Sequence, residues 1–175
     1  MGHSRLRIFD AAKLPPSASY EVDVPLSFEQ GLNIVYNDSV QDLNKDLNDL
    51  DKVSLKNAKI MLSVDNAIPL KLQLKAENVQ IKDVYGNELT AVKKTMEEDK
   101  QYVTESTDGE KPATSELVLS LTSDDTAFLS KIDRICFKIT AVPGSATGVP
   151  LKDTQWLKVT SVKLSVPGGV NVDLN

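Results

Sequence analysis

The chain has 175 residues, a formal net charge of −5 and a sequence pI near 4.9. This length is enough for one domain with a sizeable core, and the hydrophobic fraction of 41% is ordinary for a globular protein. Twenty Lys and Arg against 25 Asp and Glu form no concentrated basic footprint, which argues against a nucleic-acid partner. No apolar run approaches the length of about 18 residues that a membrane-spanning helix needs.

The N-terminal residues are expected to lie outside the fold. Pro15 and Pro16 disfavour a helix and favour an extended chain, so we interpret residues 1–17 as an N-terminal arm. The first four residues, M-G-H-S, lack the apolar region of a signal peptide and are interpreted as a remnant of an expression vector. The domain is therefore predicted to span residues 18–175.

From residue 18 onward, apolar residues alternate with polar ones in several short segments, as in strands with one buried face. The apolar members include Tyr20, Val22, Val24, Leu32, Ile34, Tyr36, Ile60, Leu62, Val64, Leu70, Leu72, Leu74, Ala76, Leu117, Leu119, Leu121, Ile135, Phe137 and Ile139. Lys59, Lys71 and Lys75 fall on the solvent face. There they favour solubility and protection of sheet edges, with an anionic ligand site as the alternative.

Turn residues divide these segments. The sequence D-V-Y-G-N at 83–87 predicts a turn with Gly86 and Asn87 at its tip. A strand is expected within residues 89–96, and the polar stretch 97–116 is expected to hold a long hairpin or a mobile loop. Residues 156–166 are expected to hold one or two strands, followed by a last strand at 170–174.

One segment has the spacing of a helix instead. Val40, Leu43, Leu47 and Leu50 recur at steps of three and four residues within 37–53, which predicts a short surface helix. One or two further helical turns are expected near residues 123–132. With about nine or ten strands and few helices, the predicted fold class is all-β. The predicted architecture is an antiparallel β-sandwich with one or two short helices, with a barrel as the alternative.

The same segment raises a question of calcium binding. Asp42, Asn44 and Asp46 repeat like the start of an EF-hand loop. The sixth position of that loop is Leu47 instead of Gly, and the twelfth is Val53 instead of Glu. A solvated helix face is the favoured interpretation, and no metal site is predicted.

Few residues here are suited to catalysis. The only histidine is His3, in the predicted arm, and the only cysteine is Cys136, which we expect to be a small buried thiol. The sequence therefore offers no candidate residues for a Ser–His–Asp or Cys–His catalytic site or for a zinc site. We expect a protein that is not an enzyme and uses no cofactor. Trp156 follows a Pro/Gly-rich loop, and we favour a core-edge position for it over a sugar-stacking platform.

Several motifs together resemble a known group of proteins. They are V-P-L-S-F at 24–28, I-V-Y-N-D-S at 34–39, L-K-N-A-K-I-M-L-S-V-D-N-A-I-P-L-K-L-Q-L at 55–74, D-V-Y-G-N at 83–87, I-D-R-I-C-F-K-I at 132–139 and V-P-G-G-V-N-V-D-L at 166–174. The chain resembles uncharacterised surface lipoproteins of Bacteroidetes over most of residues 18–175. That resemblance implies a β-sandwich held at the cell surface or outer membrane by a lipidated cysteine, which would lie upstream of this sequence. It implies no functional residue.

The leading functional hypothesis is an exported, non-enzymatic surface lipoprotein domain with a binding, structural or adhesion role. Its partner would be a surface protein, a glycan or a lipid, and it would meet the membrane only through the lost lipid anchor. The alternatives are a carrier of lipid or another small hydrophobic ligand, and a glycan-binding module. The aromatic residues open to a glycan would be Tyr36, Tyr85, Tyr102 and Trp156.

A binding surface is expected on loops, because loops are where binding residues concentrate. The longest polar or Pro/Gly-rich connections are residues 97–116 and 143–155. The candidate binding residues are Tyr85, Asn87, Tyr102 and Trp156.

Overall fold

The computed structural model describes residues 35–47, 54–143, 145, 147–166 and 170–173. The strands are β1 (Val35–Val40), β2 (Asn57–Asn66), β3 (Leu72–Lys82), β4 (Lys93–Met96), β5 (Tyr102–Val103), β6 (Ala113–Thr122), β7 (Arg134–Ala141), β8 (Leu157–Val166) and β9 (Val170–Asp173). The helical elements are α1 (Leu43–Leu47) and the single 3₁₀ turns η3 (Glu98–Lys100) and η4 (Leu129–Lys131). The predicted arm and the strands predicted before residue 35 lie outside the described residues.

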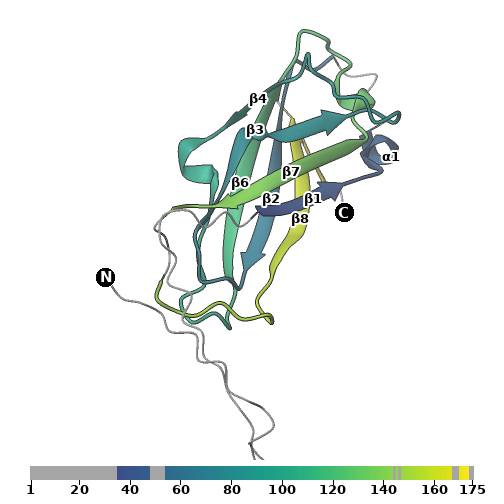
Figure 1. Cartoon of the computed structure of the whole chain (residues 1–175). Helices are drawn as coiled ribbons and strands as arrows, with labels where there is room; N and C mark the ends of the chain where they lie inside the picture. Colours follow the sequence, from purple (N-terminus) through teal and green to yellow (C-terminus); the bar gives the residue numbers. More distant parts are fainter. Residues whose placement is uncertain (1–34, 48–53, 144, 146, 167–169, 174–175) are drawn as a thin grey trace, which may run out of the picture.

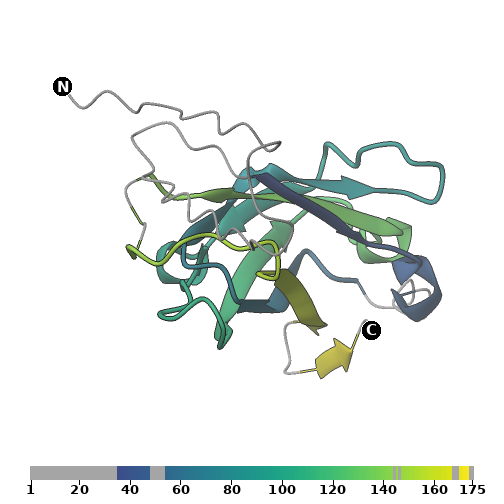
Figure 2. The ribbon, with the colours of Figure 1, turned by 60° about the horizontal axis from the view of Figure 1, so that its bottom comes forward.

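The strands form two layers, as the predicted β-sandwich requires (Figures 1 and 2). Sheet A has the order β1-β7-β3-β5, and sheet B has the order β4-β6-β2-β8-β9. Neighbouring strands pair antiparallel in both sheets. The predicted fold class is therefore confirmed. No described helix is long or apolar enough to cross a membrane.

The chain changes sheets at almost every step. From β1 to β8, each strand lies in the sheet opposite to the strand before it, and only β8 and β9 are consecutive neighbours in one sheet. The hairpin considered for residues 97–116 is therefore wrong. Residues 102–103 pair with β3 in sheet A, whereas residues 113–122 pair with β2 and β4 in sheet B.

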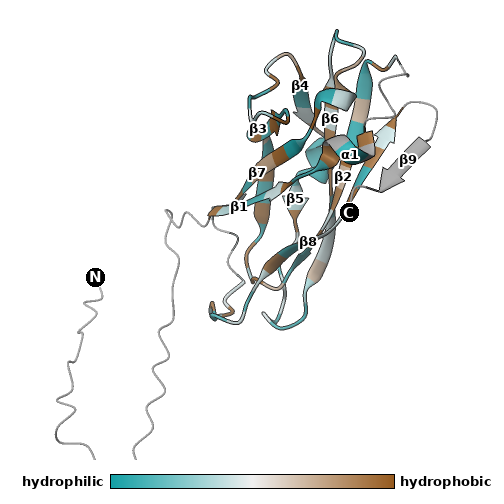
Figure 3. Ribbon diagram, turned by 90° about the vertical axis from the view of Figure 1, so that its right-hand side faces the viewer, coloured by the Kyte–Doolittle hydropathy of each residue, from teal (hydrophilic) through white to brown (hydrophobic). Residues whose placement is uncertain are grey.

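The core lies between the inner faces of the two sheets. Buried and less buried residues alternate along β2, and Ile60, Leu62 and Val64 are each at most 2% exposed. The same alternation of apolar and polar residues is visible along the strands in Figure 3. Each fully buried Leu, Ile or Val side chain contributes about 1.5–3 kcal/mol through the hydrophobic effect. The period-two pattern of the sequence is thus what places the core.

Strand β3 departs from simple alternation. Its pairing with β7 shifts register between Leu74 and Val79, so the chain bulges there. Leu72 and Leu74 point into the core before the bulge, and Val79 and Ile81 do so after it. The bulge is why the inward positions change from even to odd numbers, and why Ala76 does not continue the buried row.

The predicted helix over 37–53 is wrong in extent. Val40 is the last residue of β1, and the helix has only five residues, from Leu43 to Leu47. Asp42 separates the two elements with a positive φ of 63°. Leu43 and Leu47 are buried as the spacing predicted, whereas Leu50 lies outside the described residues.

The strand expected over residues 89–96 is shorter than predicted, because it comprises only Lys93–Met96. Residues 123–132 contain the single turn η4, in keeping with the one or two helical turns expected there. Residues 157–166 form one strand, and the last strand ends at Asp173.

A partly buried lysine connects the two sheets at the β3 bulge. Lys94 lies on β4 in sheet B, and its Nζ donates to the carbonyl oxygen of Val79 in sheet A at 2.6 Å. The same ammonium group lies 3.2 Å from Glu88 Oε1. At the bulge the carbonyl oxygen of Val79 accepts its hydrogen bond from Lys94, where the two sheets meet.

We predict that Lys94→Ala lowers the free energy of unfolding by about 1–2 kcal/mol, because a partly buried carbonyl loses a charged donor. Chemical denaturation measures this change. The matched control is Lys93→Ala, since Lys93 is the exposed neighbour on the same strand. Equal effects of the two substitutions would show that the bridge to Val79 contributes nothing.

Candidate functional site

Three connections meet at one end of the sandwich, which we call the loop end. They are residues 67–71 between β2 and β3, residues 104–112 between β5 and β6, and the described parts of 142–156 between β7 and β8. All three lie at the bottom of the molecule in Figure 1. The two loops predicted to carry binding residues are thus brought together, although they are far apart in the sequence.

A buried asparagine links two of these connections. Asn66, the last residue of β2, is fully buried. Its Nδ2 donates to the carbonyl oxygens of Leu70 at 3.1 Å and Thr104 at 2.9 Å, and its Oδ1 accepts from the backbone N–H of Ile68 at 2.9 Å. One side chain thus closes the β2–β3 turn and fixes it to the segment that follows β5.

The segment after β5 is held by a second buried polar residue. Ser106 is 1% exposed, and its hydroxyl donates to Lys111 O at 2.7 Å and accepts from Gly109 N–H at 2.9 Å. Its backbone N–H donates to Ile68 O at 3.0 Å. Two further N–H groups of this segment donate to the carboxylate of Asp108 and hold the pKa of that carboxyl group below its usual value.

Glycine is favoured at position 109 by its backbone conformation, and it lies against the third connection. Its φ is +71°, in the left-handed region that side chains rarely adopt. A Cβ atom there would also lie 2.5 Å from Nε2 of Gln155, which belongs to the third connection. The 104–112 and 142–156 connections therefore approach each other closely at Gly109.

The third connection is joined to the β2–β3 turn by hydrogen bonds. Val142 N–H donates to Lys71 O at 2.9 Å. The hydroxyl of Ser145 donates to Val142 O at 2.7 Å and lies 3.2 Å from Lys71 O. The hydroxyl of Thr147 donates to Pro69 O at 3.4 Å. The three connections thus form one hydrogen-bonded unit.

Two of the four predicted binding residues lie near this unit. Trp156 is 42% exposed, so it is not the core-edge residue that the sequence favoured, and its carbonyl oxygen accepts from Ala67 N–H at 2.9 Å. It lies immediately before β8, at the surface of the loop end. Tyr102 lies on β5, and Lys71 Nζ is 4.4 Å from the centroid of its ring, a cation–π contact.

The other two predicted residues lie at the opposite end of the sandwich. Tyr85 is 86% exposed at the tip of the turn after β3, as the turn sequence predicted. Asn87 contributes to the turn itself, since its Nδ2 and backbone N–H both donate to the carboxylate of Asp83. The four residues therefore do not form a single surface.

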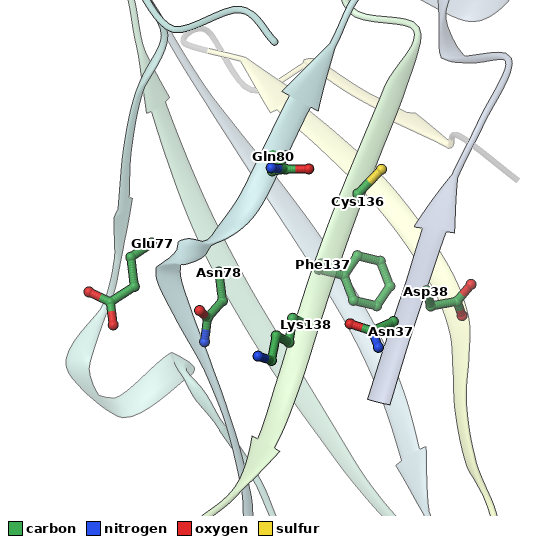
Figure 4. A pocket seen from close by; sticks show the side chains of 8 residues that line it. All are labelled: Asn37, Asp38, Glu77, Asn78, Gln80, Cys136, Phe137 and Lys138. Atoms are coloured by element: carbon green, nitrogen blue, oxygen red, sulfur yellow. The ribbon is translucent and has the colours of Figure 1, made fainter. Parts of the chain in front are cut away.

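A polar depression of about 320 Å³ lies over β1, β3 and β7 of sheet A (Figure 4). It is lined by Asn37, Asp38, Glu77, Asn78, Gln80, Cys136, Phe137 and Lys138. Cys136 is half-buried, so the expectation of a buried thiol is wrong. Its side chain lies on the outer face beside Gln80, whereas those of Ile135 and Phe137 point into the core.

Sequence reasoning missed the residues that organise these surfaces. Asn66 and Ser106 resemble ordinary turn residues, and only their burial marks them as structural. Asn37, Asn78 and Gln80 occupy polar positions of strands, and only the pairing of the strands brings them together. Alternation predicts that such residues face outward, and it does not predict their neighbours.

Metal binding was considered only for the segment that begins at Asp42. The described residues contain no group of three or more His, Cys, Asp or Glu residues placed to hold a metal ion. Leu47, at the sixth position of the EF-hand comparison, is buried in the core. His3 lies outside the described residues.

Comparison of the chain with protein-family models, with curated proteins and with solved structures found no match. Function must therefore be argued from the geometry.

We predict that Asn66→Ala lowers the free energy of unfolding by about 3 kcal/mol, because one buried carbonyl, one partly buried carbonyl and one partly buried N–H lose their partner. Asn57→Ala is the control, since Asn57 is exposed at the other end of the same strand. Thermal and chemical denaturation measure both. If the two variants are equally stable, the loop end is not held by Asn66.

The side chain of Tyr36 offers a test by titration. Burial, followed by the hydrogen bond to Asp38 and the charge of Asp38, raises its pKa to about 12. The neutral phenol therefore contributes stability that is fully present below pH about 10 and lost as the pH rises towards 12.

We predict that Asp38→Asn lowers the pKa of Tyr36 while leaving it above its ordinary value, because burial remains the largest cause. Phenolate absorbance measures the change, and Tyr36→Phe assigns the signal. An unchanged midpoint in Asp38→Asn would show that Asp38 does not act on this phenol.

Proposed function

We propose that this chain is an exported, non-catalytic binding domain of the cell surface whose partner contacts the loop end. The observation that carries the proposal is the hydrogen-bonded unit of three connections built on buried Asn66 and Ser106, with Trp156 at its surface. The hydrogen bonds of Asn66 and Ser106 hold these connections in one arrangement. A rigid loop end binds at a lower entropic cost than separate loops would.

Trp156 is the residue on which this partner would be anchored. Tryptophan is enriched among the few interface residues that carry most of the binding energy. Burying the exposed part of its ring would favour association, and the hydrogen bond from Ala67 N–H holds the backbone of Trp156 at this end. We assign a protein partner to this end, since one exposed indole suits a protein surface better than an extended sugar-binding platform.

The filled interior supports a surface function over a ligand carrier. The core between the sheets consists of packed aliphatic and aromatic side chains from both sheets. An open depression on sheet B is lined by Lys59, Ser120 and Ser165 together with the core residues Ala58, Leu121 and Val166, and the depression on sheet A is lined by polar groups such as Gln80 and Lys138. Binding at the outside of the sandwich is therefore the better proposal.

The surface location rests on the sequence resemblance to lipoproteins and is tested together with binding. The full-length protein is produced in its own cells with the photo-crosslinking residue p-benzoylphenylalanine in place of Trp156. Two matched variants carry the same residue in place of Tyr85 or Lys93, both exposed and away from the loop end. Intact cells are irradiated and then treated with an external protease.

We predict one discrete cross-linked adduct from position 156 and none from position 85 or 93. We also predict that the external protease removes this adduct, because the domain lies outside the cell. Adducts of equal yield from all three positions would contradict a partner at the loop end. An adduct that survives the protease in intact cells would contradict the surface location.

A further inference from the structure

The outer face of sheet A has an unusual composition. Strand pairing places the following side chains on it, opposite to the core: Asn37, Ser39, Lys71, Gln73, Lys75, Asn78, Gln80, Lys82, Tyr102, Arg134, Cys136, Lys138 and Thr140. Five are cations, and the described acids beside them are Glu77 in the bulge, which lies 3.9 Å from Lys75, Asp38, which lines the same depression, and Glu88, which forms a β-bridge with Lys82. This concentration of positive charge stands on a chain whose net charge is −5.

Two of these cations face each other across neighbouring strands. Lys82 on β3 is directly opposite Arg134 on β7. Like charges in that position destabilise a sheet, and neither side chain has an ion-pair partner in the described part of the chain. Arg134 Nε is also shielded from solvent without a hydrogen-bond acceptor. An anion bound here would relieve the repulsion between the two cations.

The depression beside these cations offers unused hydrogen-bonding groups. Asn37 lies opposite Lys138, and Gln80 lies opposite Cys136. The side chains of Asn37, Asn78, Gln80 and Lys138 line the depression in Figure 4, and none hydrogen-bonds another described residue. Each amide both donates and accepts, which is what pairing with hydroxyl groups requires.

Sheet B does not share this arrangement. On its outer side Lys59 pairs with Glu97 at 2.6 Å, and Glu116 pairs with Lys100 at 3.3 Å. Asp65 accepts from the hydroxyl of Thr114 at 2.6 Å. Lys93 and Lys158 on sheet B also lack an ion pair in the described chain, but only sheet A places two such cations, Lys82 and Arg134, directly opposite each other beside unused amides.

We propose that the outer face of sheet A binds an acidic polysaccharide, with carboxylate groups at Lys82–Arg134 and at Lys138, and hydroxyl groups at the amides. Arg134 and Lys138 are four residues apart on one strand, so about 13 Å separates the two cationic positions. Along an extended acidic polysaccharide, carboxylates alternate with hydroxyl groups. The carboxylates would meet the cations, and the hydroxyl groups would meet the amides that lie between the cations. This site is separate from the loop end and does not depend on it.

Other anionic partners fit less well. A membrane surface would also require apolar anchors, and the exposed large apolar side chains of the described residues, Val84, Tyr85 and Trp156, are not on this face. Single-stranded nucleic acid requires aromatic platforms for its bases, and the one candidate, Tyr102, is covered by Lys71. An acidic peptide would pair its backbone with a sheet edge instead of a sheet face.

The test uses the full chain labelled with ¹⁵N and a hexamer of galacturonic acid as the probe, followed by NMR chemical-shift mapping. We expect shifts confined to β1, β3 and β7 at the outward positions, and none with a neutral hexamer of glucose. Anionic phospholipid vesicles, polyglutamate and single-stranded DNA are tested in parallel. Tighter binding of any of these three than of the uronate hexamer would overturn the assignment.

Three variants separate a specific site from general attraction. Lys138→Glu, an exposed change that leaves the buried atoms of Arg134 in place, is expected to weaken binding at least tenfold. Lys93→Glu makes the same charge change on sheet B and is expected to alter binding less than twofold. Asn78→Ala combined with Gln80→Ala leaves the charge unchanged and is expected to weaken binding about fivefold.

Two results would contradict the proposal. Equal weakening by Lys138→Glu and Lys93→Glu would mean that the probe responds to net charge only. Full affinity in the double amide variant, or no binding to the wild type at millimolar probe, would remove the polysaccharide site. Neither result bears on the cross-link expected from position 156, so the two proposals fail independently.

Discussion

The buried carboxamide of Asn66 determines how one end of this sandwich is built. It satisfies three backbone groups that the β2–β3 turn and the chain after β5 would otherwise bury without partners. A backbone N–H or carbonyl that is buried without a partner costs about 1–3 kcal/mol. The turn and the neighbouring loop are therefore held in one arrangement relative to each other. Ser106 continues the network to Gly109, whose close contact with Gln155 brings in the third connection. The position of Trp156 depends on this chain of contacts.

The alternation of strands between sheets explains why the end is assembled from distant segments. Because each connection from β1 to β8 crosses from one sheet to the other, loops far apart in sequence emerge side by side at the same end. The two outer faces differ in how their charges are placed. Sheet B forms the pairs Lys59–Glu97 and Lys100–Glu116, whereas sheet A sets Lys82 opposite Arg134 with no ion pair for either in the described chain.

The sequence was sufficient for the fold class and for local exposure. Alternation placed Ile60, Leu62 and Val64 in the core, and the D-V-Y-G-N turn correctly placed Tyr85 in solvent. The sequence could not predict the β3 bulge or which strands pair with each other. A period of two shows which side chains share one face of a strand, but it does not show which strand lies beside it. Val118 lies between the inward Leu117 and Leu119 on the opposite face of the strand, yet it is only 6% exposed.

Native-state hydrogen exchange at the loop end tests the account most directly. Exchange at an amide reports the free energy needed to open its hydrogen bond. If the three connections form one rigid unit, the N–H groups of Ile68, Ser106 and Gly109 will exchange about as slowly as those of the central strands β2 and β6. If these amides exchange at the rates of an unstructured peptide while the strands stay protected, the connections move independently. Trp156 would then have no fixed platform, and the proposal of a binding surface at this end would be contradicted.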